Sequence, residues 1–281
     1  MKRGPLHGCA IGTFLECARM NVDLRGDSVS ASTMLGLHAK ATLQPDSERW
    51  EVSVPNIPFC ESLTSDLEDV LSLILTTGWR RAGWVPVHAA AVEKDGRCVM
   101  ICAPSGCGKS TLTAALTQNG WRTLGDDKLL LRCTNGKPDV SALLHTFNLH
   151  PQTERWFKNV GSLQSRPRYS NFTEKRRVSI DQIPGCFSVD KARLTHIVHL
   201  SRSQGSRSVS VSPMPASELL PTMLRQIVIP KDRRIAREIV QTVSQATSGL
   251  CGSYVTIGTD AYARPEWLEN FEQAIVPYMA A

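Results

Sequence analysis

The segment ICAPSGCGKSTL, residues 101–112, carries the residues best suited to chemistry. It fits the phosphate-binding pattern G-x-x-x-x-G-K-[ST], except that Ala103 stands at the first glycine position. Gly106 and Gly108 allow the backbone to turn its N–H groups inward around phosphate oxygens, and a following helix directs its positive dipole at the same point. The predicted nucleotide-binding residues here are Pro104, Ser105, Gly106, Cys107, Gly108, Lys109, Ser110 and Thr111. We expect Ala103 to strain the loop without abolishing its function.

Two side chains of this loop indicate the ligands. Lys109 is expected to reach the β- and γ-phosphates of ATP, and Ser110 to supply a hydroxyl group to Mg²⁺. ATP and Mg²⁺ are therefore the predicted cofactors. The alternative is a glycine turn that joins a strand to a helix and binds no ligand.

A pair of carboxylates follows closely. Asp126 and Asp127 come sixteen and seventeen residues after Ser110, whereas the metal-binding acid of most P-loop enzymes lies much later in the sequence. The flanking segments WRTLG (121–125) and KLLLR (128–132) indicate strands. If these strands lie side by side, both carboxylates come beside the phosphate loop. Taken alone, Asp-Asp-Lys also fits a polar β-turn.

The elements around the loop are predicted from local patterns. VPVHAAAV (85–92) and RCVMICA (97–103) indicate a hairpin around EKDG, whose second strand leads into the loop. A helix is expected from Lys109 to Asn119, with Gly120 beyond its end.

The N-terminal part has a different sequence pattern. Alternating segments between residues 28 and 54, such as SVSAS and RWEVSVP, indicate strands of a small sheet. A helix follows, with Asp66 as its cap and Gly78 and Gly83 at its end. Its apolar face comprises Leu67, Val70, Leu71, Ile74 and Leu75. We therefore divide the chain into a small β-rich part, residues 1–84, and a P-loop domain, residues 85–281, with SRSQGSRS (201–208) as a mobile loop.

Composition excludes several classes of protein. The chain of 281 residues is 42% hydrophobic, enough for a sizeable core, and the apolar run near its start is interrupted by Glu16 and Arg19. That run fits neither a signal peptide nor a membrane span. Nine scattered cysteines without a C-x-x-C pair indicate reduced thiols in the cytoplasm.

The net charge of +6 is modest, and the positive residues gather in RPRYSNFTEKRR and PKDRRIAR. This distribution favours anionic ligands or a solvated face over a nucleic-acid surface.

Residues 84–133 resemble the catalytic core of HPr kinase/phosphorylase and its shorter relatives, with His88, the phosphate loop, Asp126 and Asp127 in register. The resemblance implies an α/β fold: a P-loop, HPr kinase-like catalytic domain with a mixed sheet, beside the small N-terminal β-rich part. It also implies that Asp126 takes the proton from an attacking serine hydroxyl, that His88 orients Asp126, and that Asp127 assists with Mg²⁺ beside Ser110. Phosphoryl transfer agrees with this set, because it needs a cradle, a metal and one positioned base. For His88 the alternative is a histidine packed in a strand.

The sequence departs from the bifunctional enzymes of this family. They carry an acidic residue where this chain has Thr111, and their glycine- and arginine-rich second signature is not evident, so we expect a kinase without the dephosphorylating reaction. The segment FTEKRRVSID (172–181) takes the place of a basic loop near the phosphates. Lys175, Arg176 and Arg177 are therefore candidates to stabilise transition-state charge, or else a solvated basic edge.

The predicted acceptor also follows from resemblance. Short proteins of this kind are similar to the lasso-peptide kinases, which implies phosphorylation of the C-terminal serine of a ribosomal precursor peptide. The alternatives are another protein or small hydroxylated substrate, and a nucleotide-binding regulator without chemistry. Nucleic acid and membrane are not expected as partners, while a homo-oligomer and the nucleotide preference stay open.

Overall fold

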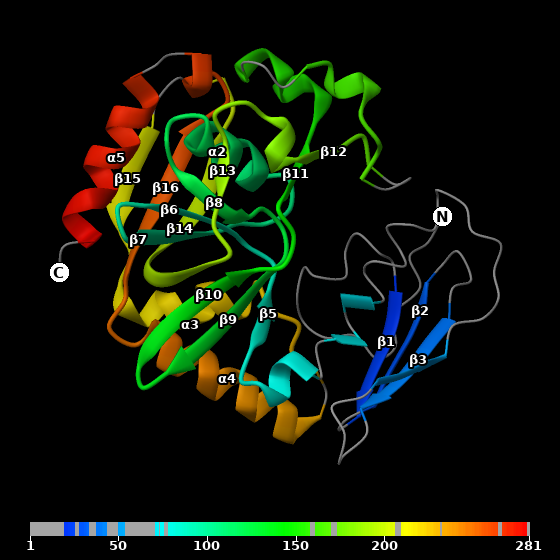
Figure 1. Cartoon of the computed structure of the whole chain (residues 1–281). Coiled ribbons are helices and arrows are strands. Elements are labelled where there is room, and N and C mark those ends of the chain that lie inside the picture. The colour runs from blue at the N-terminus through cyan, green and yellow to red at the C-terminus, as the bar shows by residue number, and fades with distance from the viewer. Residues whose placement is uncertain are drawn as a thin grey trace.

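The computed structural model describes residues 20–25, 28–33, 38–43, 50–53, 71–72, 74–75, 78–157, 161–169, 173–205, 209–230, 232–263 and 266–279. The N-terminal strands β1 (Met20–Arg25), β2 (Ser28–Thr33), β3 (His38–Leu43) and β4 (Trp50–Ser53) pair antiparallel in chain order. They form a sheet of their own, drawn in blue in Figure 1. The strands predicted between residues 28 and 54 are confirmed, and β1 was missed.

The predicted helix before the P-loop domain is only partly described. Residues 71–72, 74–75 and 78–81 are helical, and the chain then turns at Gly83 with a φ of +78°. Ile74 is 1% exposed, whereas Leu71 and Leu75 are 39% and 40% exposed, so of these three residues of the predicted apolar face only Ile74 is buried. Asp66, Leu67 and Val70 lie outside the described residues.

A large mixed sheet forms the centre of the protein and confirms the predicted α/β class. Its strands are β5 (Val85–Val87), β6 (Ala90–Lys94), β7 (Arg97–Cys102), β8 (Arg122–Gly125), β9 (Leu129–Thr134), β10 (Lys137–Ala142), β13 (Phe187–Ser188), β14 (Lys191–Ser203), β15 (Val209–Pro213) and β16 (Cys251–Gly258). Around β7 the order is β8-β6-β7-β14-β16. Strands β7, β14 and β16 run parallel, while β6 runs antiparallel to both β7 and β8.

Helices cover both faces of this sheet (Figure 1). Helices α2 (Lys109–Thr117) and α5 (Glu266–Met279) cover one face, and α3 (Ala216–Leu224) and α4 (Arg233–Thr247) cover the other. Strand β7 shows why: Val99 and Ile101 pack with the α2 and α5 side chains, whereas Met100 packs with those of α3 and α4. Because alternate residues of a strand point to opposite faces, a strand buried on both sides must be apolar throughout.

The predicted hairpin is confirmed in its second half only. Strands β6 and β7 are joined by a tight turn in which Asp95 and Gly96 have φ of 52° and 78°, the left-handed pair of a two-residue hairpin. The first predicted strand is divided at His88 and Ala89: β5 pairs with β9, and β6 pairs with β7.

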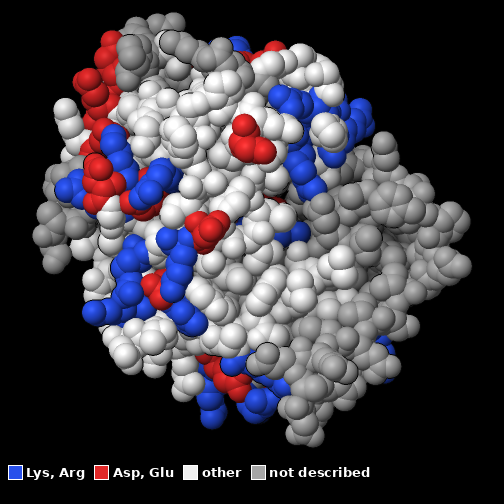
Figure 2. Space-filling model, viewed as in Figure 1, with Lys and Arg blue, Asp and Glu red and all other residues white. Residues whose placement is uncertain are grey.

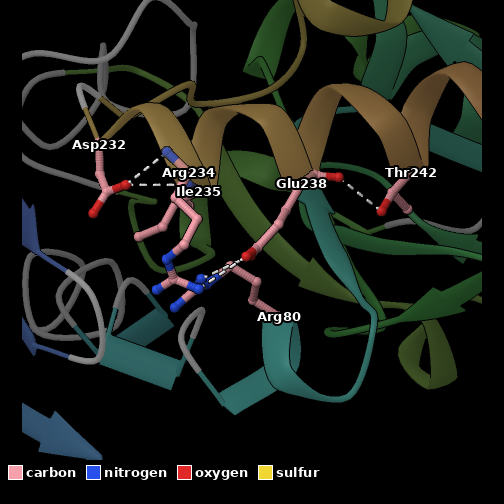
Figure 3. A network of polar contacts seen from close by, with 6 residues as sticks. All are labelled: Arg80, Asp232, Arg234, Ile235, Glu238 and Thr242. Carbon is pink, nitrogen blue, oxygen red and sulfur yellow. Dashed lines mark hydrogen bonds and ion pairs between the residues drawn. The ribbon is translucent and has the colours of Figure 1, made fainter.

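Helix α4 is fixed at its start and along its exposed side (Figure 3). The Asp232 side chain accepts hydrogen bonds from the N–H groups of Arg234 and Ile235, which caps the helix. Glu238 then pairs with Arg234 one turn earlier and with Arg80 at 3.0 Å. The segment before β5 is thereby joined to α4.

None of the described helices is both long and apolar enough to cross a bilayer.

Candidate active site

The phosphate loop lies between the end of β7 and the start of α2. Gly106 and Gly108 have φ of +82° and +98°, values that favour glycine. The N–H groups of Gly106, Gly108, Lys109 and Ser110 donate to no described backbone carbonyl, so they are available to an anion at the helix N-terminus. The helix predicted from Lys109 is confirmed; it ends at Thr117, and Gly120 follows with φ of +91°.

The expected strain at Ala103 is wrong. Among the described non-glycine residues, positive φ occurs at Asp95 and Asn135 only. Ala103 is fully buried with the side chains of the α2 face, and its small methyl group fits there. The carbonyl of Ala103 accepts a 2.8 Å hydrogen bond from Nζ of Lys109, which folds back over the loop. Burial lowers the pKa of this buried lysine, and the nearby Asp127 and Asp126 oppose that shift.

Asp126 and Asp127 follow the end of β8 and line the cavity beside the phosphate loop, but the strand pairing that brings them there differs from the one considered in the sequence analysis. Strands β8 and β9 do not pair with each other; β8 pairs with β6, and β9 pairs with β10 and β5. Strand β6 lies between β8 and β7, so it is the shared neighbour that brings both carboxylates beside the phosphate loop.

Asp126 is buried and has one free oxygen. Its Oδ2 accepts a 2.9 Å hydrogen bond from the N–H of Asn148, while Oδ1 has no partner in the described structure. The side chain is 2% exposed. Burial raises the pKa of Asp126 to about 6, although the Asn148 N–H and the nearby Ser110 hydroxyl lower it in part.

Asp127 has the opposite environment. Its Oδ1 accepts from Nδ1 of His88 at 2.9 Å, and its Oδ2 accepts from the Tyr169 hydroxyl at 3.1 Å. Burial alone would raise the pKa of Asp127, but the charge and hydrogen bond of His88, with the charge of Lys128, hold it well below its usual range. The prediction that His88 orients Asp126 is therefore wrong: His88 contacts Asp127.

His88 is placed by the break between β5 and β6. The backbone N–H of His88 donates to the backbone carbonyl of Gln226 at 2.8 Å. The buried Gln226 amide, oriented to satisfy its neighbours, donates to the carbonyls of His88 and Ala103. Gln226 thus connects the histidine segment to the phosphate loop, a link without any signal in the sequence.

The three predicted basic residues separate in space. Lys175 lines the cavity at the phosphate loop. Arg176 is buried elsewhere in β12 (Arg176–Ser179), donating to the Arg166 carbonyl and to Gln164. Arg177 lies over the Tyr169 ring, 5.3 Å from its centroid, beside a small hollow that includes Asp127. Only Lys175 lies where a phosphate-contacting residue was predicted.

A cavity of about 350 Å³ lies at the phosphate loop. Its lining includes the predicted residues His88, Asp126, Asp127, Lys175, Pro104, Ser105, Gly106, Cys107, Gly108, Lys109, Ser110 and Thr111. It also includes residues that the sequence did not suggest: Asn148, His150, Gln152, Thr153, Arg155, Trp156, Tyr169, Arg202, Ile257, Gly258, Thr259 and Tyr262. On the face shown in Figure 2, the described Lys and Arg side chains form separate groups with acidic residues among them.

The donor atoms present fit Mg²⁺ and a nucleotide. Ser110 offers a hydroxyl oxygen, Asp126 and Asp127 offer carboxylate oxygens, and these hard ligands suit Mg²⁺. The free Oδ1 of Asp126 is a buried oxygen that still lacks a partner. No cluster of three or more His, Cys, Asp or Glu occurs among the described residues, so nucleotide oxygens and water would complete the coordination.

Comparisons with known proteins give two findings. The family model of the SynChlorMet cassette protein ScmC matches residues 61–151, a stretch that holds His88, the phosphate loop, both aspartates and Asn148. No curated protein matches. The structure of the Hpr(Ser) kinase/phosphatase from Coxiella burnetii is similar over 67% of this chain and 96% of that one, with 12% identity and a TM-score of 0.35.

Proposed function

We propose that this protein is an ATP- and Mg²⁺-dependent kinase that transfers the γ-phosphoryl group to a serine hydroxyl. The observation that carries the proposal is Asp126, a buried carboxylate with one free oxygen, beside the phosphate loop. A carboxylate with a pKa of about 6 is close to the working pH of a general base. A purely structural aspartate at this depth would be expected to have both oxygens satisfied.

The two aspartates are suited to different tasks because their environments separate their pKa values. In the proposed reaction, the serine oxygen attacks the γ-phosphorus, the bond to the β–γ bridging oxygen breaks, and the serine proton passes to Asp126. Asp127 stays ionised, held by His88 and Tyr169, and assists Mg²⁺ together with Ser110. Mg²⁺ supplies charge neutralisation on the phosphate oxygens when bound.

The phosphate loop and its lysines stabilise the transferred group. Its free N–H groups and Lys109 face the charge that develops on the phosphoryl oxygens, and Lys175 lies across the same cavity. For Lys109 this requires Nζ to leave the Ala103 carbonyl.

For the acceptor we propose the C-terminal serine of a lasso-type ribosomal precursor peptide. The cavity lining carries Lys175, close enough to both aspartates to affect their pKa values, in addition to Lys109. An ammonium group there suits a peptide's terminal carboxylate as well as it suits a phosphate.

The test is transfer to matched peptides. Purified protein is incubated with ATP and Mg²⁺ and with precursor peptides from neighbouring genes, each in a serine-ended and an alanine-ended version. We expect one phosphoryl group on the serine-ended peptide by mass spectrometry, and none on its match or with Asp126→Asn protein. Phosphate on a folded protein or a small hydroxylated molecule instead would contradict the acceptor. Tight ATP binding without transfer to any of these would contradict the kinase and favour a nucleotide-binding regulator.

A further inference from the structure

The cavity has two ends on opposite sides of the phosphate loop. In the order β8-β6-β7-β14-β16 the loop follows β7 in the middle. His88, Asp126 and Asp127 come from the β6 and β8 side, and Arg202, Thr259 and Tyr262 come from the ends of β14 and β16 or just beyond. The end of β16 is two strand spacings, about 10 Å, from the loop strand. The proposed chemistry uses one end and leaves the other without a role.

This second end is aromatic. Tyr262, in the short η5 helix (Ala261–Ala263), and Trp156, at the end of the η2 helix (Pro151–Trp156), both line the cavity, with ring centroids 5.5 Å apart. Tyr262 also packs edge-on against Trp267 of α5 at 5.1 Å, and Trp267 is buried in the core. The tyrosine ring is therefore held by contacts with both Trp267 and Trp156, and it also lines the cavity.

A flat group already occupies part of this corner. The exposed guanidinium of Arg155 lies 4.6 Å from the centroid of the Trp156 ring. This contact shows that the indole face accepts a planar cation, and an exposed arginine can leave it when a better partner arrives. Ile257 adds an apolar wall, so the corner combines ring faces and an aliphatic side chain with the polar groups of Arg202 and Thr259.

We propose that this aromatic corner, Trp156 and Tyr262, holds the purine base of the nucleotide by stacking. The inference rests on the proposed function, because the phosphates must lie in the loop. The distance between the phosphate loop and the aromatic corner is comparable to the distance between the base and the triphosphate of a nucleotide. The catalytic end of the cavity then stays free for the acceptor. One segment serves both ends: Asn148 binds Asp126, and the chain continues to Trp156.

Recognition of the base by stacking also predicts how strongly the protein discriminates between ATP and GTP. The acidic residues that line the cavity are Asp126 and Asp127, both at the catalytic end. A carboxylate that accepts from the guanine N–H groups is thus absent from the described lining of the corner. Stacking discriminates weakly between bases because each has a π-face. We expect ATP and GTP to bind with affinities within about tenfold of each other.

Calorimetry with Mg²⁺ and three ligands tests the inference: ATP, GTP and inorganic tripolyphosphate. We expect Trp156→Leu and Tyr262→Leu each to weaken ATP binding by about 5- to 100-fold and to leave tripolyphosphate binding unchanged. Tyr262→Phe should bind ATP nearly as the parent does, because the ring is kept. Trp84→Leu is the matched control, since Trp84 lies under Arg132 and outside the cavity lining.

Two results would overturn the stacking site. One is equal affinity of the parent for ATP and tripolyphosphate. The other is unchanged ATP affinity in a folded Trp156→Leu protein, including the case in which this variant instead raises the KM for the peptide. Binding of neither ATP nor tripolyphosphate would overturn the proposed function itself, and the base site with it. Melting temperatures identify variants that do not fold. If Tyr262→Leu does not fold, the ATP affinity of Trp156→Leu alone tests the stacking site, because Trp156 is only half-buried.

Discussion

Replacing Asp126 by asparagine should make the protein more stable and inactive at the same time. Asparagine keeps the shape of the side chain and an oxygen that can accept from the Asn148 N–H. It removes a charge that is buried at 2% exposure. It also removes the only group proposed to accept the serine proton, so the rate of phosphoryl transfer should fall on the order of 10²- to 10⁴-fold.

The size of the stability gain follows from the pKa. The pKa of Asp126 is raised from 3.8 to about 6, so the folded protein gives up this proton less readily than the unfolded chain does. Below about pH 4 both states are protonated and there is no penalty. Between about pH 4 and pH 6 the unfolded chain is ionised while the folded Asp126 stays protonated, so the penalty grows by about 1.4 kcal/mol per pH unit to about 3 kcal/mol, and above about pH 6 it stays constant. Asparagine has no such penalty, so its advantage should be present at pH 8 and absent at pH 4.

The assay is thermal or urea unfolding in EDTA, without nucleotide, at pH 4 and pH 8, beside single-turnover transfer. We expect the melting temperature of Asp126→Asn to exceed that of the parent by roughly 5 to 10 °C at pH 8. The adjacent Asp127→Asn is the matched control with the opposite sign. The low pKa of Asp127 means that its ionised form stabilises the fold above its unfolded pKa, so its loss should lower stability at pH 8. An Asp126→Asn protein that is less stable than the parent at pH 8, or that transfers phosphate near the parent rate, would refute this reasoning.

Three further predictions concern neighbouring residues. Lys109→Ala should weaken ATP–Mg²⁺ binding and abolish transfer, because the loop loses its buried cation; unchanged affinity by calorimetry would count against the phosphate loop. His88→Ala should raise the pKa of Asp127 by removing its hydrogen bond and charge, so transfer should need more Mg²⁺ as the pH falls, whereas a merely packed histidine would change only the melting temperature. Lys175→Ala should slow transfer with little loss of stability, while Arg176→Ala should lower the melting temperature because Arg176 is buried in β12; the reverse pattern would show that Arg176 approaches the phosphates.

Local patterns were enough to predict the centre of the fold. The loop, its helix from Lys109, the strands on either side of the aspartates and the hairpin after Lys94 all depend on residues close in the sequence. Glycine positions and apolar runs determine such elements directly. The division of the chain between residues 84 and 85 stays a prediction.

The errors arose where distant segments meet. Strand pairing is not encoded by neighbours in the chain, so the sequence left open whether β8 lies beside β9, and the structure pairs β8 with β6 and β13 instead. Asp126 and Asp127 lie in a bend after β8, where only Asp127 reaches His88, and the sequence does not say which of the two would do so. Tyr169 and Tyr262 line the cavity although they lie far from the phosphate loop in the sequence, and no spacing rule connects them to the loop.

The break between β5 and β6 at His88 and Ala89 marks a part of the site in which an insertion would not be tolerated. Because β5 is in register with β9 and β6 with β7, one inserted residue in either strand would move the histidine away from Asp127. Beyond β11 (Thr146–Leu149), the short η2 helix also lines the cavity, and in the described structure it is not part of a sheet. An insertion in η2 would therefore move Trp156, and with it the proposed base site, without moving His88 or the two aspartates. The nucleotide preference of this protein should thus be easier to change than its phosphate chemistry.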